Sequence, residues 1–198
     1  MRVLLLSPYP ATLIPALEAA GDTLAGHWDD AEYVVSFGHR AIIGEPYLTQ
    51  FAGRMINLHT SMLPWNHGAD PNFWSWFDDT PKGVSIHQID AGIDTGDVMV
   101  SWSAELDRRG TLRSTYDELR RAMIDLFAME WKYIRAGRYA PQPQAGTGSY
   151  HRSRDMPELP DGWDTPVSEV REMGVRHRME GEFWRQIAER QGWVWSNA

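Results

Sequence analysis

Apolar residues recur along this chain with two periods, which separate the expected strands from the expected helices. Short apolar or alternating runs predict strands at Arg2–Ser7, Tyr33–Phe37, Met55–His59, Val84–Ile89 and Val98–Trp102. Wider spacings and capping residues predict helices at Thr12–Ala20, Pro46–Phe51, Pro71–Trp76 and Thr111–Ala136. The last two strand runs alternate apolar with polar residues, so they are expected to be antiparallel or edge strands that flank a loop. The order of the elements is typical of the α/β class.

The longest periodic pattern covers Thr111–Ala136 and predicts one amphipathic helix that Gly137 ends. Its apolar stripe is expected in the core and consists of Leu112, Tyr116, Leu119, Met123, Phe127, Trp131 and Ile134. Residues Pro141–Pro160 are rich in Pro, Gly, Ser and Gln, which indicates an irregular segment. Two short helical patterns follow, at Val167–Met173 and Glu180–Gln191. We therefore expect a main domain over residues 1–146 and, over residues 147–198, a linker with a small helical C-terminal appendage.

Composition narrows the class of protein. The chain has 198 residues, no cysteine and a formal charge of −8. The absence of cysteine excludes disulfides and thiol catalysis and favours a cytoplasmic location. The first apolar run is too short for a signal peptide, and no run approaches the roughly 20 residues that span a membrane. A protein without nucleic acid or membrane partners is expected, because phosphate binding depends on clustered basic residues.

The first strand-to-helix turn argues against a dinucleotide cofactor. Ser7-Pro8-Tyr9-Pro10 stands where a glycine-rich fingerprint would cradle a pyrophosphate, so NAD and FAD are disfavoured.

A polar pair ends the apolar run Met55–His59. Side chains two residues apart face the same side of a strand, so Asn57 and His59 are expected to point together. They lie at the carboxyl end of the strand, where open α/β sheets place their ligand crevices. Acyl transfer needs a base, donors for a developing oxyanion and a group that orients the base. We predict His59 as the base, Asn57 as an amide donor, and Asp94 of the following loop as the carboxylate that orients His59 and relays protons.

Simpler interpretations fit parts of this pattern. An isolated Asn-x-His at a strand end can merely satisfy backbone groups, but the glycine-containing loop Thr60–Gly68 that follows suits a binding site. A metal site is disfavoured because the spacing matches no zinc or calcium motif among His59, His67, His87, Asp90, Asp94 and Asp97.

The other histidines carry little expectation of function. His87 alternates within a strand and is expected to be exposed or capped. No partner is recognisable in the sequence for His27, His39, His151 and His177.

The segments Ile56–Pro64 and Ile93–Asp97 together resemble the formyltransferases that use 10-formyltetrahydrofolate. The motif of that family is an Asn, a His two residues later, Ser-Leu-Leu-Pro, and a distant Asp before a Gly. Here Met62 replaces the commoner Leu with little change of volume. The resemblance covers roughly residues 1–146 and implies a compact Rossmann-like fold with a mostly parallel sheet. The segments Pro64–Asn66, Phe73–Ser75 and Thr80–Val84 resemble the formylation domain of linear gramicidin synthetase.

The resemblance also implies ligands and their contacts. The implied formyl donor is 10-formyltetrahydrofolate, and no metal is implied. Folate is expected against Phe37, Gly38, Arg40, Ala41 and Ile42, and against Asp90, Ala91, Gly92 and Ile93. Acceptor contacts are expected from Ser61, Trp65, Asn66 and Asp70. The favoured acceptor is an amine or hydroxylamine of a small peptide-like or natural-product metabolite, and a carrier protein and a second copy of the chain stay open as partners.

Several alternatives stay open. One alternative acceptor is a nucleotide-linked amino sugar. A second alternative is water, which would give hydrolysis of the formyl-folate. A non-catalytic folate- or carrier-binding module represents a different class of function. A tRNA acceptor is disfavoured, because methionyl-tRNA formyltransferases carry a C-terminal barrel for RNA that this sequence does not show. The C-terminal segment contains Trp163, Trp184, Trp193 and Trp195. These tryptophans are expected to pack on the core, cover the site or mediate dimerisation.

Overall fold

A six-stranded sheet forms the centre of the computed structural model, which describes residues 1–191. Its order is β2-β1-β3-β4-β6-β7. The strands are β1 (Arg2–Leu6), β2 (Thr23–Leu24), β3 (Tyr33–Ser36), β4 (Met55–His59), β6 (Gly83–Gln88) and β7 (Val98–Ser103). Neighbours from β2 to β4 pair in parallel, whereas β6 runs antiparallel to both β4 and β7. The mostly parallel α/β fold expected from the sequence is confirmed.

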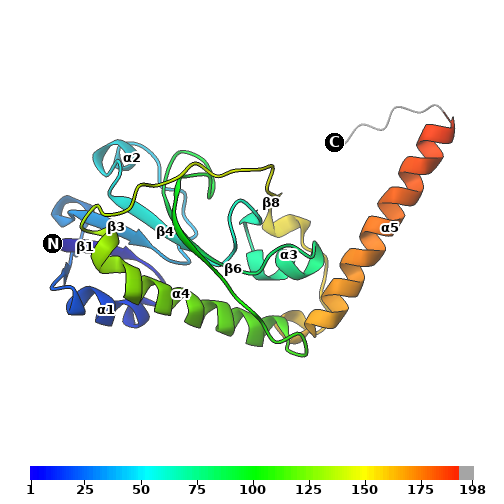
Figure 1. Ribbon diagram of the computed structural model, residues 1–198, viewed down its shortest axis with the longest axis horizontal. Coiled ribbons are helices and arrows are strands. Elements are labelled where there is room, and N and C mark those ends of the chain that lie inside the picture. The colour runs from blue at the N-terminus through cyan, green and yellow to red at the C-terminus, as the bar shows by residue number, and fades with distance from the viewer. Residues whose placement is uncertain (192–198) are drawn as a thin grey trace.

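Helices cover both faces of this sheet (Figure 1). The two long helices on one face, α1 (Pro10–Ala19) and α4 (Leu112–Ile134), share the largest apolar cluster with the sheet. On the other face, α2 (Tyr47–Gln50) and the short turn η1 (Trp28–Asp30) pack around a smaller cluster. Val3 and Leu4 belong to opposite clusters. Strands buried on both faces read as continuous apolar runs, which explains why the sequence identified them.

The predicted stripe of α4 is buried except for Tyr116, which is half-buried. The helix begins where predicted, because the Thr111 side chain accepts the backbone N–H of Ser114 in a capping box. Its first residue, Leu112, belongs to a second cluster with α3 (Pro71–Phe77) and the start of α5 (Val167–Gln191).

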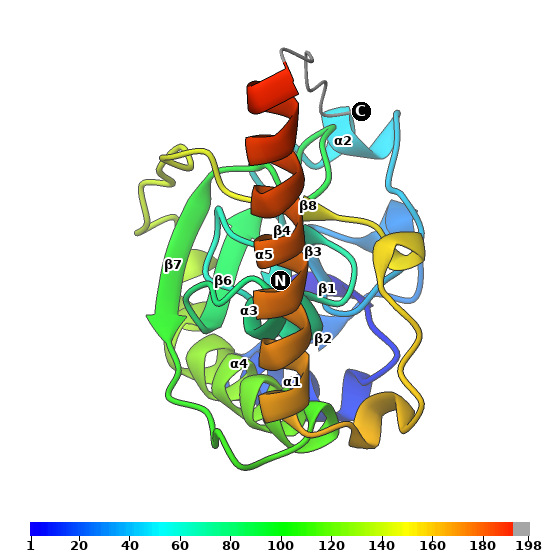
Figure 2. The ribbon, with the colours of Figure 1, turned by 90° about the vertical axis from the view of Figure 1, so that its right-hand side faces the viewer.

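The prediction of two short C-terminal helices is wrong. Helix α5 is continuous over 25 residues and leaves the body of the protein as a long projection (Figure 1). Figure 2 looks along the molecule from the side of this helix. The interruption in the pattern comes from Gly174, where an added Cβ would lie 1.8 Å from the carbonyl oxygen of Phe77. Glycine serves close packing of α5 on α3 here and does not end the helix.

The segment expected to be irregular contains structure of its own. Within it, β8 (Tyr150–His151) pairs in parallel with β5 (His67–Gly68), and η2 (Ser153–Asp155) follows. A further short turn, η3 (Gly162–Asp164), leads into α5. The pairing of β8 with β5 brings the segment beside the loop that follows β4.

Of the C-terminal tryptophans, Trp163 packs against the second apolar cluster. The Trp184 side chain, Trp193 and Trp195 lie outside the described part of the chain. Within residues 1–191, none of the helices is both long and apolar enough to cross a bilayer.

Candidate active site

The carboxyl end of β4 positions Asn57 and His59, as the strand period predicts. Antiparallel pairing places Asn57 opposite His87 of β6 and His59 opposite Ser85. After β6 the chain turns through residues 89–97, here called the Asp94 loop, before β7 begins. The loop 60–70 after β4, here called the catalytic loop, comes from the other side. The two loops meet at Asp94.

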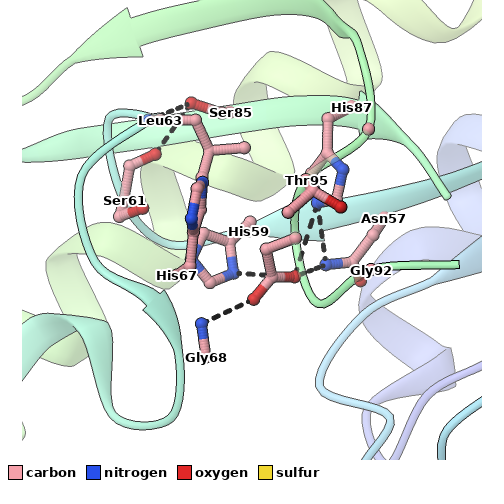
Figure 3. A network of polar contacts seen from close by, with 12 residues as sticks. Asn57, His59, Ser61, Leu63, His67, Gly68, Ser85, His87, Gly92 and Thr95 are labelled. Carbon is pink, nitrogen blue, oxygen red and sulfur yellow. Dashed lines mark hydrogen bonds and ion pairs between the residues drawn. The ribbon is translucent and has the colours of Figure 1, made fainter. Parts of the chain in front are cut away.

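Asp94 contacts both predicted residues, Asn57 and His59. Figure 3 shows the side chains of Asn57, His59 and His87 gathered in one network of polar contacts. Oδ1 of Asp94 accepts the amide of Asn57 at 3.2 Å and lies 3.6 Å from Nδ1 of His59. Its Oδ2 accepts the backbone N–H of Gly68 at 2.8 Å. The backbone of Asp94 is left-handed, with φ of 57°, a conformation that Asp and Asn tolerate better than other side chains. The structure thus brings Asn57, His59 and Asp94 together.

The His59 ring is buried and its tautomer is set by its neighbours. Nε2 lies 3.0 Å from the carbonyl oxygen of Asn66, so it carries a proton and donates. In the neutral ring, Nδ1 is then the free base, and it faces the Asp94 carboxylate. Burial lowers the pKa of His59, while the charge of Asp94 opposes the decrease. A neutral imidazole beside a carboxylate is therefore the resting state near pH 7.

Asp94 is the charged member of the pair. Burial alone would raise its pKa, but attraction to a protonated His59, the contact with His87 and the hydrogen bond from Gly68 hold the pKa well below its usual range. The carboxylate is ionised at neutral pH, and it can stabilise a proton that arrives on Nδ1 of His59.

His87 is a site residue that the sequence did not predict, and the expectation that it is exposed is wrong. Its side chain is 2% exposed. Nδ1 donates to the carbonyl of Gln88 at 2.7 Å, which leaves Nε2 to accept the amide of Asn57 at 3.2 Å. Nε2 is also 3.5 Å from Oδ1 of Asp94. The amide nitrogen of Asn57 therefore donates to both His87 and Asp94. To donate to an oxygen of a bound substrate, it must give up one of these two contacts.

The four residues predicted to contact the acceptor differ in their surroundings. Asn66 is 0% exposed and Ser61 is 1% exposed. Ser61 donates to the carbonyl of Trp65, and the Asn66 side chain bonds Thr80 and Ser149. Both residues shape the catalytic loop and offer little surface to a ligand.

Trp65 and Asp70 are half-buried and stand nearer to solvent. Burial raises the pKa of the Asp70 carboxyl, and the charge of Arg40 opposes the rise. Acceptor contacts from Trp65 and Asp70 stay predictions.

The two segments predicted to hold folate flank this centre. Phe37 is buried in the main core, and residues 38–42 and 90–93 are exposed. Ile42 is 83% exposed and Ile93 is 44% exposed. Ile43 and Ile89, which adjoin the two segments, pack on the same cluster of the sheet. Each segment thus offers an exposed isoleucine and accessible backbone, a combination that suits a flat ring with polar edges.

Two further observations complete the surroundings. His151, for which the sequence suggested no partner, stacks on Trp74 with ring centroids 3.9 Å apart and pairs with Asp78 at 2.9 Å. The structure over residues 1–191 holds no cluster of three or more His, Asp or Glu side chains arranged to bind a metal ion.

A buried imidazole, an ionised carboxylate and an amide at the carboxyl edge of an α/β sheet are groups that general acid–base catalysis uses. The family model described as formyl transferase matches residues 20–128, more than half of the 198 residues. The chain belongs to the formyl transferase family.

Individual relatives agree with this assignment. The formyltransferase PseJ from Anoxybacillus kamchatkensis, solved in complex with UDP-4,6-dideoxy-4-formamido-L-AltNAc and tetrahydrofolate, is 38% identical with a TM-score of 0.82. That match covers 88% of this chain and 100% of PseJ. A 4-N formyltransferase from Francisella tularensis shares the fold, with a TM-score of 0.70, 14% identity and 87% of each chain covered. Methionyl-tRNA formyltransferase from Nitrobacter winogradskyi is 31% identical over 155 residues, which cover 75% of this chain and 49% of that protein. The chain spans about half or less of the curated relatives it matches.

Proposed function

We propose that this protein is an N-formyltransferase that moves the formyl group of 10-formyltetrahydrofolate to the amino group of a nucleotide-linked amino sugar. The observation that supports this reaction is the contact of Asp94 with both Asn57 and His59 at the carboxyl end of β4. The acceptor class rests on the 38% identity to PseJ, whose whole chain is covered and whose complex holds a formylated UDP-sugar and tetrahydrofolate. The sequence alone favoured a peptide-like acceptor, and this similarity favours the nucleotide sugar instead.

The donor supplies a formyl group on nitrogen, activated for transfer to an amine. Residues 38–42 and 90–93 would hold it through exposed backbone and through Ile42 and Ile93. Asp90 is committed to shaping its own loop, because its Oδ1 accepts both the N–H of Gly92 and the hydroxyl of Thr95.

His59 and Asp94 act together on the proton of the attacking amine. The amine loses a proton as its nitrogen bonds to the formyl carbon, and Nδ1 of His59 is the free base. The ionised Asp94 carboxylate stabilises the resulting imidazolium across 3.6 Å. The proton can then reach the departing nitrogen by way of this pair or a water molecule bound to it.

Asn57 has the amide suited to the developing charge on the formyl oxygen. Its nitrogen lies 3.2 Å from both Asp94 and His87, contacts that are long for N–H···O and N–H···N bonds. Exchanging the contact with the His87 nitrogen for a negatively charged oxygen costs little and gives a stronger, charge-assisted hydrogen bond.

The test is a mixing assay with purified protein, 10-formyltetrahydrofolate and separate acceptors, followed by mass spectrometry. The acceptors are UDP- and dTDP-linked amino sugars, free amino sugars and peptide-like amines. We expect formylation of a nucleotide-linked amino sugar, abolished by His59→Ala. Formylation of peptide-like amines alone would refute the acceptor class. Release of formate without a formylated product would point to hydrolysis.

A further inference from the structure

Residues 141–151, here called the strap, run alongside both loops of the site. At its start, Gln142 and Val98 exchange two backbone hydrogen bonds of 2.9 and 2.8 Å. At its end, Ser149 accepts the N–H of His67 at 2.8 Å, and β8 continues the pairing with β5. The strap is thus fixed to the strand that follows the Asp94 loop and to the catalytic loop.

Between these ends, the side chain of Gln144 bridges the two loops. Its amide nitrogen donates to the carbonyl of Asp94 at 2.7 Å and to the carbonyl of Gly96 at 2.9 Å. Because both partners are acceptors, the nitrogen must face the Asp94 loop. Its oxygen then accepts from Nε2 of His67 in the catalytic loop at 2.8 Å. All three contacts therefore agree with a single orientation of the amide.

The strap also reaches the other side of His59. The Ser149 hydroxyl accepts the backbone N–H of Asn66 at 2.9 Å and donates to its side-chain oxygen at 3.1 Å. Asn66 has a left-handed backbone, with φ of 59°, and its carbonyl fixes Nε2 of His59. Both groups that orient the His59 ring, the Asn66 carbonyl and the Asp94 carboxylate, are thus held by the strap.

We propose that Gln144 is a positioning residue for formyl transfer, because its amide fixes the Asp94 loop against the catalytic loop and so sets Asp94 relative to His59. This inference rests on the proposed function. Gln144 does not touch the reacting groups. It acts through the backbone of Asp94, whose carboxylate contacts Gly68 of the catalytic loop and His59 at the end of β4.

The expected effect lies on the chemical step. A displacement of about 1 Å between reacting groups can cost on the order of a hundredfold in rate. Gln144→Met keeps the length and volume of the side chain and removes all three hydrogen bonds. We expect kcat to fall between about tenfold and a hundredfold while the KM values for donor and acceptor stay within about threefold.

A second variant separates the donor and acceptor parts of the bridge. Gln144→Glu keeps an oxygen for His67 but replaces the amide nitrogen with an oxygen that faces two carbonyls. We expect its kcat to fall at least as far as that of Gln144→Met. The matched control is Gln142→Met, because Gln142 is exposed on the same strap and its amide bonds only the nearby carbonyl of Ala140 in the described structure.

The experiment measures kcat, both KM values, the thermal midpoint and backbone amide exchange for the wild type and these variants. Loss of kcat with unchanged KM, midpoint and control activity supports the inference. Wild-type kcat in Gln144→Met overturns it, and so does a parallel loss of kcat and thermal midpoint. If the wild type itself forms no formylated product, the proposed function fails. Exchange at Gly68 then still tests the bridge: faster exchange in Gln144→Met supports it and unchanged exchange overturns it.

Discussion

Replacement of Asp94 by Asn isolates the charge at the centre of the site. The substitution keeps the size of the side chain and retains an oxygen that can accept the N–H of Gly68, which the carboxylate binds at 2.8 Å. It removes the negative charge that lies 3.6 Å from Nδ1 of His59, and it also replaces the oxygen that accepts the Asn57 amide at 3.2 Å with an amide nitrogen. Folding of the Asp94 loop should therefore survive, while the imidazolium formed during catalysis loses its counter-ion.

The size of the effect follows from that distance. Two unit charges about 4 Å apart attract by about 4 kcal/mol at the effective dielectric constant of about 20 that suits protein sites. Loss of this stabilisation from the rate-limiting step would lower kcat by up to about a thousandfold, since each 1.4 kcal/mol is about tenfold. Partial protonation of His59 in the transition state would give a smaller loss, so we expect a decrease of about a hundredfold to a thousandfold.

The assay is the initial rate of formyl transfer at saturating donor and acceptor, with folate binding and the thermal midpoint measured on the same samples. Asp125→Asn on the exposed side of α4 is the control for the loss of one carboxylate. We expect near wild-type folate binding and midpoint for Asp94→Asn. A kcat within about tenfold of the wild type would refute the assignment of Asp94 as the counter-ion of His59.

Four further predictions concern pH and stability. Burial lowers the pKa of His59, so kcat/KM should decrease at acidic pH with an apparent pKa below the value of about 6.5 for an ordinary histidine. An apparent pKa above that value in the pH–rate profile would contradict the effect of burial. Because His59 binds a proton less readily in the native state than in the unfolded state, its contribution to the free energy of unfolding should fall as pH drops below about 6.5. Denaturant titrations at several pH values measure this decrease. Asp22→Ala removes a buried carboxylate that pairs with Arg135 at 2.8 Å and should cost about 3 kcal/mol or more of unfolding free energy, without loss of kcat in the folded enzyme. Gly174→Ala should lower the free energy of unfolding by about 1 to 3 kcal/mol, because the added Cβ would lie 1.8 Å from the last carbonyl oxygen of α3. In the control Gly181→Ala the added Cβ meets nothing within 4 Å, so no destabilisation is expected, and equal thermal midpoints for the two variants would contradict the packing of α5 on α3.

The fold follows from local patterns that the sequence displays openly. Buried strands such as β1 and β3 contain continuous apolar runs, and α4 keeps its stripe over 23 residues. The strand period also places Asn57 and His59 on one face without knowledge of the neighbours. These elements depend on short-range periodicity and burial, which is why they could be predicted.

The surroundings of the site depend on contacts between distant residues, and these leave no local signal. His87 alternates in its strand like a surface residue, and its role arises from the antiparallel register that sets it opposite Asn57. Gln144 lies in a segment whose composition indicates a loop, yet it bonds residues about 50 and 77 positions away. The sequence predicts two helices where the structure has the single helix α5. The reason is that a glycine within a helical pattern indicates a break, and the contact of Gly174 with α3 is not visible in the sequence.

The central claim is formyl transfer to a nucleotide-linked amino sugar. The most direct measurement supplies 10-formyltetrahydrofolate labelled with carbon-13 in the formyl group and follows the label by NMR in the presence of a UDP-linked amino sugar. We predict that the labelled carbon appears as a formamide on the sugar with the wild type and with Gln142→Met, and that it stays on the folate with His59→Ala. Label that remains on folate with the wild type, or that appears only as formate, would contradict the account.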